Sequence, residues 1–287
     1  MSNFFSPLRY PGGKTCNYDF VVSLFEENNL QDVYYVEPYA GGAGLALKLL
    51  CTNKVSRIFL NDFDSSIYCF WNVILNYTDE FCSWIENVEV SVNNWKKFRD
   101  IHNNQNRYSD MEIAQSVLFL NRCNVSGVIK GGVIGGINQS GKYKIDARFN
   151  KKNLISKIYN VAEYKNKIEL YHEDGIEFIK KINFNHKLFF YLDPPYYNKG
   201  HKLYLNFYNH QNHRDLAFSI ESLKKHNWII SYDNAEFIKE LYGAYRKLSY
   251  KLRQSTSNKI GDEILIFDNK LIFDKSKFVL SNASLLS

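Results

Sequence analysis

The stretch LFFYLDPPY, residues 188–196, decides the fold of this chain. Its apolar and aromatic first half predicts a buried strand. The two prolines that follow have no N–H to give to a sheet, so the strand ends there and the chain turns outward. Asp193 and Tyr196 are therefore presented at the carboxyl end of a strand, the edge at which open α/β sheets bind their ligands.

This combination suits the binding of an exocyclic amino group on a flat base. Asp193 and the carbonyl group of Pro194 can accept its two N–H bonds, and Tyr196 can stack on the ring. The segment alone fits equally well a strand that ends in a proline turn with a capping Asp. The rest of the chain decides between the two interpretations.

The composition indicates a globular protein with a mild basic excess. The 287 residues are 45% hydrophobic and 23% charged, enough for one large α/β domain with an insertion. The net charge of +6 permits a nucleic-acid partner. The 5 cysteines form no C-x-x-C pair, and His172, His186 and His226 have no ligand spacing, so we assign no metal and no disulfide framework. We expect no signal peptide and no membrane span.

Strand and helix signals alternate at both ends of the chain. Strands are predicted at 32–39 and 55–60, with a Gly-rich turn and a helix over 43–52 between them. Further strands are predicted at 168–171, 187–192, 228–232, 245–252 and 263–267, with helices over 212–226 and 235–241. The alternation predicts a Rossmann-like, doubly wound α/β sheet.

The alternation breaks in the middle of the chain. The pattern over 64–124 is helical, with Asp79 and Asp110 as expected N-caps. Residues 124–150, rich in Gly, Asn and Lys, predict a loop and hairpin, and an amphipathic helix follows over 151–165. We therefore divide the chain into a catalytic domain, residues 1–63 and 166–287, and an inserted module, residues 64–165.

The turn EPYAGGAG, residues 37–44, follows the first predicted strand. Its glycines permit a tight turn and the close approach of a ligand, but Leu47 stands where a dinucleotide fingerprint has its third Gly. Asp62 ends the next strand about twenty residues later, where an acid can bind both hydroxyls of a ribose. The Gly-rich turn and Asp62 together favour an adenosyl ligand. The alternative is a generic tight turn in which Asp62 caps a helix. Asp174 could likewise accept the amino group of an adenine, or cap a helix.

In this order the motifs resemble those of the Dam-type, D12 class DNA adenine-N6 methyltransferases over most of the chain. PLRYPGGK at 7–14 resembles the N-terminal cofactor motif of the family, residues 37–44 its glycine-rich motif, and residues 193–196 its catalytic motif. The resemblance implies a sheet of the adenosylmethionine-dependent methyltransferase type with an inserted helical and hairpin DNA-recognition module. It implies S-adenosyl-L-methionine as cofactor, bound by Tyr10, Lys14, Glu37, Pro38, Tyr39, Gly41, Gly42, Asp62, Asp174 and Asp193.

The inserted module carries the residues that would contact DNA. Asn121-Arg122, with Gly127 following, resembles the start of the family's target-reading hairpin. The chain departs from the family in three places. Gly175 stands where Phe often follows the acid, Lys130 stands where some members have Arg, and the Gly-rich sequence at 130–136 differs from that of GATC-specific members. Lys130 and the glycines after it favour a recognition site other than GATC. The residues expected to contact DNA are Arg9, Asn121, Arg122, Asn124, Lys130, Arg148 and Lys151.

We therefore expect an enzyme that methylates N6 of adenine in a specific double-stranded DNA site after flipping the base out, as in restriction-modification. Asp193, Pro194 and Tyr196 are the expected catalytic residues. The alternatives are methylation of cytosine N4, RNA or a glutamine amide, and a DNA-binding relative without turnover. The Asp at position 193 argues against the three other methylation targets. The intact Asp193, Tyr196 and Asp62 argue against a DNA-binding relative without turnover. We expect a cytoplasmic, DNA-associated monomer.

Overall fold

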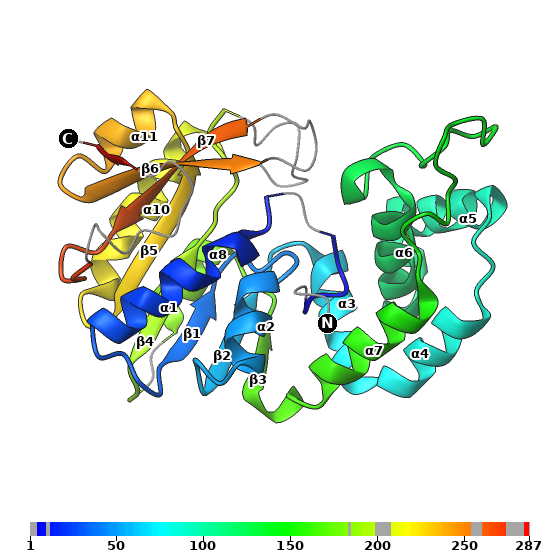
Figure 1. Ribbon diagram of the computed structural model, residues 1–287, viewed down its shortest axis with the longest axis horizontal. Coiled ribbons are helices and arrows are strands. Elements are labelled where there is room, and N and C mark those ends of the chain that lie inside the picture. Colours follow the sequence, from blue (N-terminus) through cyan, green and yellow to red (C-terminus); the bar gives the residue numbers. More distant parts are fainter. Residues whose placement is uncertain are drawn as a thin grey trace. The chain divides into compact units, whose positions relative to one another are not determined.

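The predicted strands assemble into one mixed sheet. The computed structural model describes residues 5–9, 12–182, 185–198, 208–253, 260–273 and 284–286, so Tyr10 lies outside the described residues. Within them the sheet has 8 strands in the order β3-β2-β1-β4-β5-β7-β6-β8 (Figure 1). The strands are β1 (Tyr34–Glu37), β2 (Arg57–Asn61), β3 (Ile168–Tyr171), β4 (Leu188–Leu192), β5 (Asn227–Asp233), β6 (Arg246–Arg253), β7 (Ile260–Phe267) and β8 (Ser284–Leu286).

The parallel half of the sheet fixes where a ligand can bind. β1 pairs in parallel with β2 on one side and with β4 on the other, so the direction of winding reverses between β1 and β4. Such a switch point opens a crevice at the carboxyl ends of the strands. β7 runs antiparallel to β5, with Asp233 opposite Glu263, so the beginning of β7 lies at that same edge.

Helices cover both faces of the sheet. α1 (Tyr18–Glu27) and α2 (Gly44–Cys51) lie on one face (Figure 1). On that face Phe25 of α1 packs edge-on against Phe189 of β4. α8 (Gly175–Lys181), α10 (His210–Ser219) and α11 (Glu236–Leu241) contribute to the core on the other face. All five residues of β4 are buried, because a central parallel strand packs against helices on both sides. This explains the continuous apolar run that precedes Asp193.

The chain divides into two compact units. The sheet unit comprises Lys14–Phe63 and Lys167–Ser287, and the helical unit comprises Met1–Gly13 and Asp64–Asn166. The helices of the helical unit are α3 (Ser65–Asn76), α4 (Thr78–Asn87), α5 (Val92–Asn103), α6 (Asp110–Cys123) and α7 (Lys151–Ala162). Short 3-10 turns complete the chain: η1 (Lys14–Asn17), η2 (Gln105–Arg107), η3 (Val125–Gly127), η4 (Lys165–Lys167) and η5 (Ile220–Leu223).

The N-terminal segment packs with the helical unit, although the sequence analysis placed it in the catalytic domain. The side-chain amide of Asn121 accepts a hydrogen bond from the Arg9 N–H at 2.8 Å and donates one to the Arg9 carbonyl at 2.9 Å. Arg122 donates to the carbonyl of Pro7, and Lys157 donates to that of Ser6 at 3.3 Å. Side chains of α6 and α7 thus bind three backbone carbonyl groups, those of residues 6, 7 and 9, at the beginning of the N-terminal motif.

Several predicted elements are confirmed and others are wrong. β3 has the predicted bounds, but the helix cap before α6 is Ser109, which forms a reciprocal capping box with Glu112, and not Asp110. Asp79 lies in the first turn of α4 without capping it. Residues 124–150 form no hairpin strands, because their pairing is limited to one isolated bridge between Asn124 and Val133. No helix in the described part of the chain has both the length and the apolar character needed to cross a bilayer.

Candidate functional site

The carboxyl ends of the parallel strands bring the predicted acids to one edge of the sheet. Glu37 ends β1, and Asp62 follows β2 directly. Asp174 follows β3 by three residues, and Asp193 follows β4 directly. Because these strands are parallel, their carboxyl ends lie at the same edge. The edge is therefore rich in carboxylates and lies at the switch point between β1 and β4.

The Gly-rich turn after β1 is held in place by Asp62. Gly41 has φ 46° and Ala43 has φ 45°, both in the left-handed region that a tight turn requires. The Gly41 N–H donates to Asp62 Oδ2 at 2.7 Å. A Cβ at Gly44 would lie 2.5 Å from Thr15 Oγ1, so the start of α2 needs a residue without a side chain. Asp62 therefore braces the turn from the end of β2.

Asn61 is a supporting residue that the sequence analysis did not assign. Its side chain is buried and donates to the carbonyls of Pro38 at 2.9 Å and Glu173 at 3.0 Å. It also accepts from the Glu173 N–H at 2.9 Å. One amide thus ties together the turns that follow β1 and β3. Asp174 caps α8, because its Oδ1 accepts from the N–H groups of Ile176 and Glu177.

An aromatic ring lies close to Asp174 even though residue 175 has no side chain. A Cβ at Gly175 would lie 2.5 Å from the ring of Tyr39. The Tyr39 hydroxyl is 2.9 Å from the hydroxyl of Tyr208, which fixes the ring from its outer end. Gly175 is therefore the residue that makes room for Tyr39 at this edge.

Asp193 is anchored through one of its two oxygens. Lys14 Nζ lies 3.0 Å from Asp193 Oδ1, and Ser231 Oγ donates to the same oxygen at 2.7 Å. Burial raises the pKa of Asp193, while Lys14 and the Ser231 hydroxyl act in the opposite direction. The side chain nevertheless remains 23% exposed. The carboxylate is thus oriented from one side and open on the other.

Tyr196 belongs to a buried network of charged groups. Its hydroxyl accepts from Lys14 Nζ at 2.7 Å and donates to Glu263 Oε1 at 2.6 Å. The other oxygen of Glu263 accepts from the Tyr250 hydroxyl at 2.7 Å. Glu263 was missed by the sequence analysis, although an acid at the beginning of the apolar run EILIF was a usable signal. All four side chains are buried.

Burial of Glu37 favours the neutral form of its carboxyl group. It is buried, and burial raises its pKa to about 8, with the nearby Asp193 adding to the effect. The Tyr35 hydroxyl donates to Glu37 Oε1 at 3.0 Å, which only partly offsets the cost of burying the charge. Near neutral pH the buried part of the edge therefore carries less negative charge than its composition suggests.

In the helical unit we define the recognition loop as residues 124–150, between α6 and α7. Asn124 at its beginning is buried and accepts from Trp95 Nε1 at 2.7 Å. Its Nδ2 donates to the carbonyls of Val128 at 2.9 Å and Ile129 at 2.7 Å. The amide of Asn121 is also buried, and it donates to the Gly127 carbonyl as well as to Arg9. We therefore revise the expected role of both asparagines from base contact to support of the loop.

A second group of side chains shapes the rest of the recognition loop. Arg99 of α5 donates to the carbonyls of Lys130 and Gly131 while its guanidinium lies 4.8 Å from the Trp95 ring centroid. Gln139 Nε2 donates to the Ile134 carbonyl at 2.8 Å, and its Oε1 accepts from the Ile145 N–H at 2.8 Å. These side-chain hydrogen bonds to backbone groups thus stabilise the conformation of the loop. The side chains exposed on it include Val125, Lys130, Ile137, Asn138, Tyr143 and Arg148.

Arginine side chains beside the recognition loop are half-buried, and each has one buried nitrogen without a hydrogen-bond partner. Arg9 Nη1 and Arg122 Nε are buried and have no hydrogen-bond partner. Burial and the neighbouring Arg9 lower the pKa of Arg122 to about 10, and burial and Arg148 lower the pKa of Arg9. Clustered cations of this kind favour an anionic partner. Lys151, by contrast, donates to the Glu86 carbonyl at 2.9 Å.

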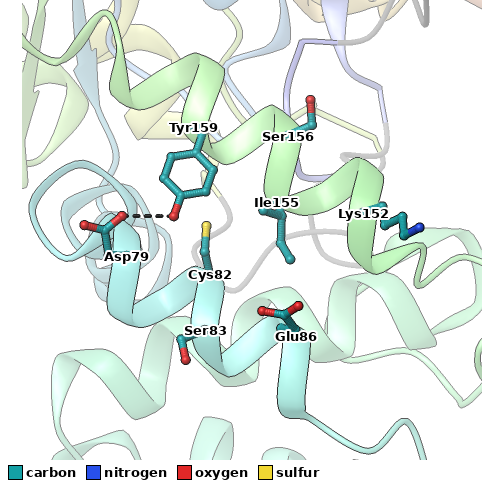
Figure 2. Close-up of a pocket in the computed structure, with 8 residues that line it drawn as sticks. All are labelled: Asp79, Cys82, Ser83, Glu86, Lys152, Ile155, Ser156 and Tyr159. Carbon is teal, nitrogen blue, oxygen red and sulfur yellow. Dashed lines mark hydrogen bonds between the residues drawn. The ribbon is translucent and has the colours of Figure 1, made fainter.

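A shallow hollow lies between α4 and α7 (Figure 2). The Tyr159 hydroxyl donates to Asp79 at 2.9 Å, and Glu86 adds a second carboxylate, while the ammonium of Lys152 points away from the other side chains (Figure 2). Two acids make the hollow unsuited to phosphate, and we assign it no ligand. No cluster of three or more His, Cys, Asp or Glu able to hold a metal ion occurs among the described residues.

The strand order, the switch point and the acid-rich edge are those of an S-adenosylmethionine-dependent methyltransferase. Residues 10–256 match the family of D12 class N6 adenine-specific DNA methyltransferases, and the chain belongs to that family. It is an adenine-specific DNA methyltransferase that acts on N6. Membership implies S-adenosylmethionine as methyl donor and DNA as substrate. The Type II methyltransferase M.MjaIII of Methanocaldococcus jannaschii is 24% identical over 206 residues, which cover 66% of this chain and 68% of the relative.

Proposed function

We propose that the sheet unit binds S-adenosylmethionine and performs methyl transfer, while the helical unit recognises a specific double-stranded DNA site. The carboxylates at the strand ends support the first assignment, and the half-buried arginines beside the recognition loop support the second. Because one chain carries both, we propose that it acts as a monomer. Sedimentation velocity would test this, since a dimer of stable mass contradicts it.

The acid-rich edge fits a cationic adenosyl cofactor better than a dinucleotide. A pyrophosphate would meet Asp62, Asp174 and Asp193, whereas a sulfonium and an amino group are attracted to carboxylates. Asp62 would accept from the ribose hydroxyls, Asp174 from the adenine amino group, and Tyr39 would pack against the adenine ring. When bound, the cofactor supplies an electrophilic methyl group. Further proposed contacts to it are Tyr10, Lys14, Glu37, Pro38, Gly41, Gly42 and Asp193.

The anchoring of Asp193 is the observation that carries the proposed chemistry. Adenine N6 is a weak nucleophile because its lone pair is delocalised into the ring. Lys14 and Ser231 both engage Oδ1, which leaves Oδ2 to accept one N6 hydrogen. The carbonyl of Pro194 would accept the other, so that N6 approaches tetrahedral geometry and its lone pair becomes available. Fixed acceptors of this kind act by positioning and by matching the charge of the transition state.

The base must leave the duplex to reach these acceptors, at a cost of a few kcal/mol for unstacking. Tyr196 is proposed to stack on the extruded adenine. Transfer would then require no nucleophilic cysteine, because the C–S bond of the cofactor would break as the C–N6 bond forms, S-adenosylhomocysteine would leave, and the extra N6 proton would pass to solvent.

The test is Asp193→Asn, which keeps the size of the side chain but removes its charge. We expect a folded protein that binds DNA with unchanged affinity and a kcat reduced by about 100-fold or more, because an amide is a poorer acceptor. Mass spectrometry of digested DNA measures N6-methyladenine, and Asp215→Asn, an exposed acid on α10, is the matched control. Near-normal turnover of Asp193→Asn would remove Asp193 from the chemistry.

On the DNA side, the recognition loop presents both polar and apolar groups. We propose that Lys130 and Arg148 contact base edges, that Arg9, Arg122 and Lys151 contact the phosphate backbone, and that the site differs from GATC. Val125 is 54%, Ile137 50% and Tyr143 61% exposed, although side chains of this type are usually buried. Exposed apolar groups on a basic loop suit contact with thymine methyl groups in the major groove.

A further inference from the structure

Two buried carboxylates hold the segment that follows the catalytic Asp-Pro-Pro turn. Asp233 on β5 and Glu263 on β7 lie directly opposite each other in an antiparallel pair, so both side chains lie on the same face of the sheet. Asp233 accepts from the N–H groups of Tyr197 and Asn198, each at 2.9 Å. Glu263 accepts from the Tyr196 hydroxyl at 2.6 Å. Three consecutive residues, 196–198, are thus held by one pair of acids.

The burial of these acids demands an explanation. Asp233 is 3% and Glu263 1% exposed, and a buried carboxylate costs free energy unless it is hydrogen-bonded and paired. Asp233 meets this requirement with two backbone N–H donors. Glu263 meets it with the Tyr196 and Tyr250 hydroxyls and with Lys14, whose Nζ lies 3.7 Å from Oε2. Apolar side chains could fill the same space without the cost of burying a charge. The specific contribution of the two carboxylates is therefore the set of groups that they bind.

We infer that Glu263 is a positioning residue that fixes the ring of Tyr196 and the charge beside Asp193, an inference that rests on the proposed function. The Tyr196 hydroxyl is bound from two sides, by Lys14 and by Glu263, which restricts rotation of its ring before a base arrives. Stacking on an extruded base then requires no ordering of the ring.

Glu263 also shares Lys14 with Asp193. Lys14 Nζ lies 3.0 Å from Asp193 Oδ1 and 3.7 Å from Glu263 Oε2, so the two acids compete for one ammonium. Without the charge of Glu263, Lys14 would neutralise Asp193 more completely and make it a weaker acceptor for the N6 hydrogen. Glu263 thus acts on the reaction through both of its neighbours and touches neither the base nor the methyl group.

The experiment is a double-mutant cycle with Glu263→Gln and Tyr196→Phe. We expect Glu263→Gln to lower kcat by about 10-fold or more, while the Kd values for cofactor and DNA change by less than about 3-fold. Both substitutions act on the Tyr196–Glu263 hydrogen bond, which Tyr196→Phe removes and the neutral amide of Glu263→Gln weakens. The double variant should therefore be no slower than the slower single variant. Asp262→Asn, the exposed neighbouring acid, should leave kcat unchanged. Tyr250→Phe, which removes one partner of Glu263 and leaves Tyr196 untouched, should lower kcat by about 3-fold.

The outcomes separate this inference from the proposed function. If the wild type makes no N6-methyladenine, the proposed function fails. If the wild type is active and the two substitutions multiply in kcat, or if Tyr250→Phe and Glu263→Gln both retain wild-type kcat, the positioning role is overturned. A loss of kcat that only matches a loss of folded protein, followed by circular dichroism, would show that Glu263 supports the scaffold alone. If Glu263→Gln does not fold, the Tyr250→Phe result decides.

Discussion

At the scale of single residues, the fold sets the charge and the position of side chains that look ordinary in the sequence. Glu37 follows a strand like many acids, yet its burial raises its pKa to about 8. Gly175 looks like any other glycine in the sequence, yet the absence of a Cβ leaves the space that the ring of Tyr39 occupies. Both effects depend on neighbours that are close in space, so each can be tested by a substitution that changes little else.

Glu37 should make the stability of the free protein depend on pH. Its pKa is higher in the folded state than the ordinary 4.5, so its contribution is fully present below about pH 4.5 and is lost as the pH rises to about 8. Glu37→Gln should remove this loss, and at pH about 9 it should be more stable than the wild type by roughly 2–4 kcal/mol. Urea unfolding across this range measures the effect. Glu240→Gln, an exposed acid, should retain the wild-type slope, and a retained slope in Glu37→Gln would refute the prediction.

Gly175→Ala should weaken cofactor binding. The new Cβ would lie 2.5 Å from the Tyr39 ring, closer than side chains pack, so the ring or α8 must shift. We expect the Kd for S-adenosylmethionine to rise by about 10-fold and the free energy of unfolding to fall by about 1–3 kcal/mol. Calorimetry measures the first and denaturant unfolding the second. Gly132→Ala, where a Cβ meets no atom within 4 Å, is the control, and equal Kd values in both variants would contradict this role of Gly175.

At the scale of elements, the recognition loop shows how an irregular segment is given one shape. Positive φ angles at Ser126, Gly127, Gly135, Gly136 and Gln139 prevent regular strands. A Cβ at Gly127 would lie 2.4 Å from the Arg9 carbonyl, so this glycine lets the N-terminal segment approach. Trp95 and Arg99, both on α5, then hold the loop through its carbonyl groups and Asn124.

Arg99→Lys should therefore change which sequences are methylated without changing the net charge. Lysine cannot donate to two carbonyls in the fixed geometry of a guanidinium, so the turn at Lys130 should lose its support. We expect the preference for the best site over near-cognate sites to fall by about 10-fold, while the salt dependence of DNA binding is kept. Lys96 is an exposed cation on the same helix. Lys96→Ala should keep the site preference and reduce the salt dependence of DNA binding. Methylation mapping by long-read sequencing checks both, and an unaltered profile in Arg99→Lys would exclude the supporting role.

The parts of the fold that the sequence could predict are those in which the local pattern agrees with the tertiary environment. β3 and β4 were found because their apolar runs are short and end at turn residues. α1 was missed because no side chain caps it, and the cap of α6 was misplaced because Ser109 and Asp110 are adjacent acceptors. The hairpin was wrong because alternating apolar residues do not reveal left-handed backbone angles. The acid at the beginning of EILIF marks Glu263 as unusual, but its role was missed because its partner Tyr196 is 67 positions away, a pairing that no local pattern encodes.

At the scale of the whole molecule, the net charge is +6, and the cations that contribute to it have different surroundings in the two units. In the sheet unit several cations form ion pairs, among them Lys14 and Arg57. In the helical unit Arg9 and Arg122 keep buried donors without partners. DNA affinity should therefore depend mainly on the cations of the helical unit.

Salt dependence should separate the cations that read bases from those that bind phosphate. We expect Lys130→Ala and Arg148→Ala to relax site preference by about 1–3 kcal/mol. Lys151→Ala should weaken binding to all sequences alike and reduce the slope of log K against log salt by about 1. Fluorescence titrations at several salt concentrations, together with methylation maps, measure both quantities. An unchanged site profile in Lys130→Ala and Arg148→Ala would exclude both as readers, and a wild-type profile confined to GATC would refute the expected departure.

The attachment of Met1–Gly13 to the helical unit has a practical consequence for protein engineering. The chain passes from one unit to the other after Gly13, after Phe63 and after Asn166, so no single cut releases either unit. A chimera meant to acquire the sequence preference of a relative must therefore exchange two separate segments together. A graft of 64–166 alone would place the imported Asn121, Arg122 and Lys157 positions against an N-terminal segment from another protein. The transferred sequence specificity would then be lost.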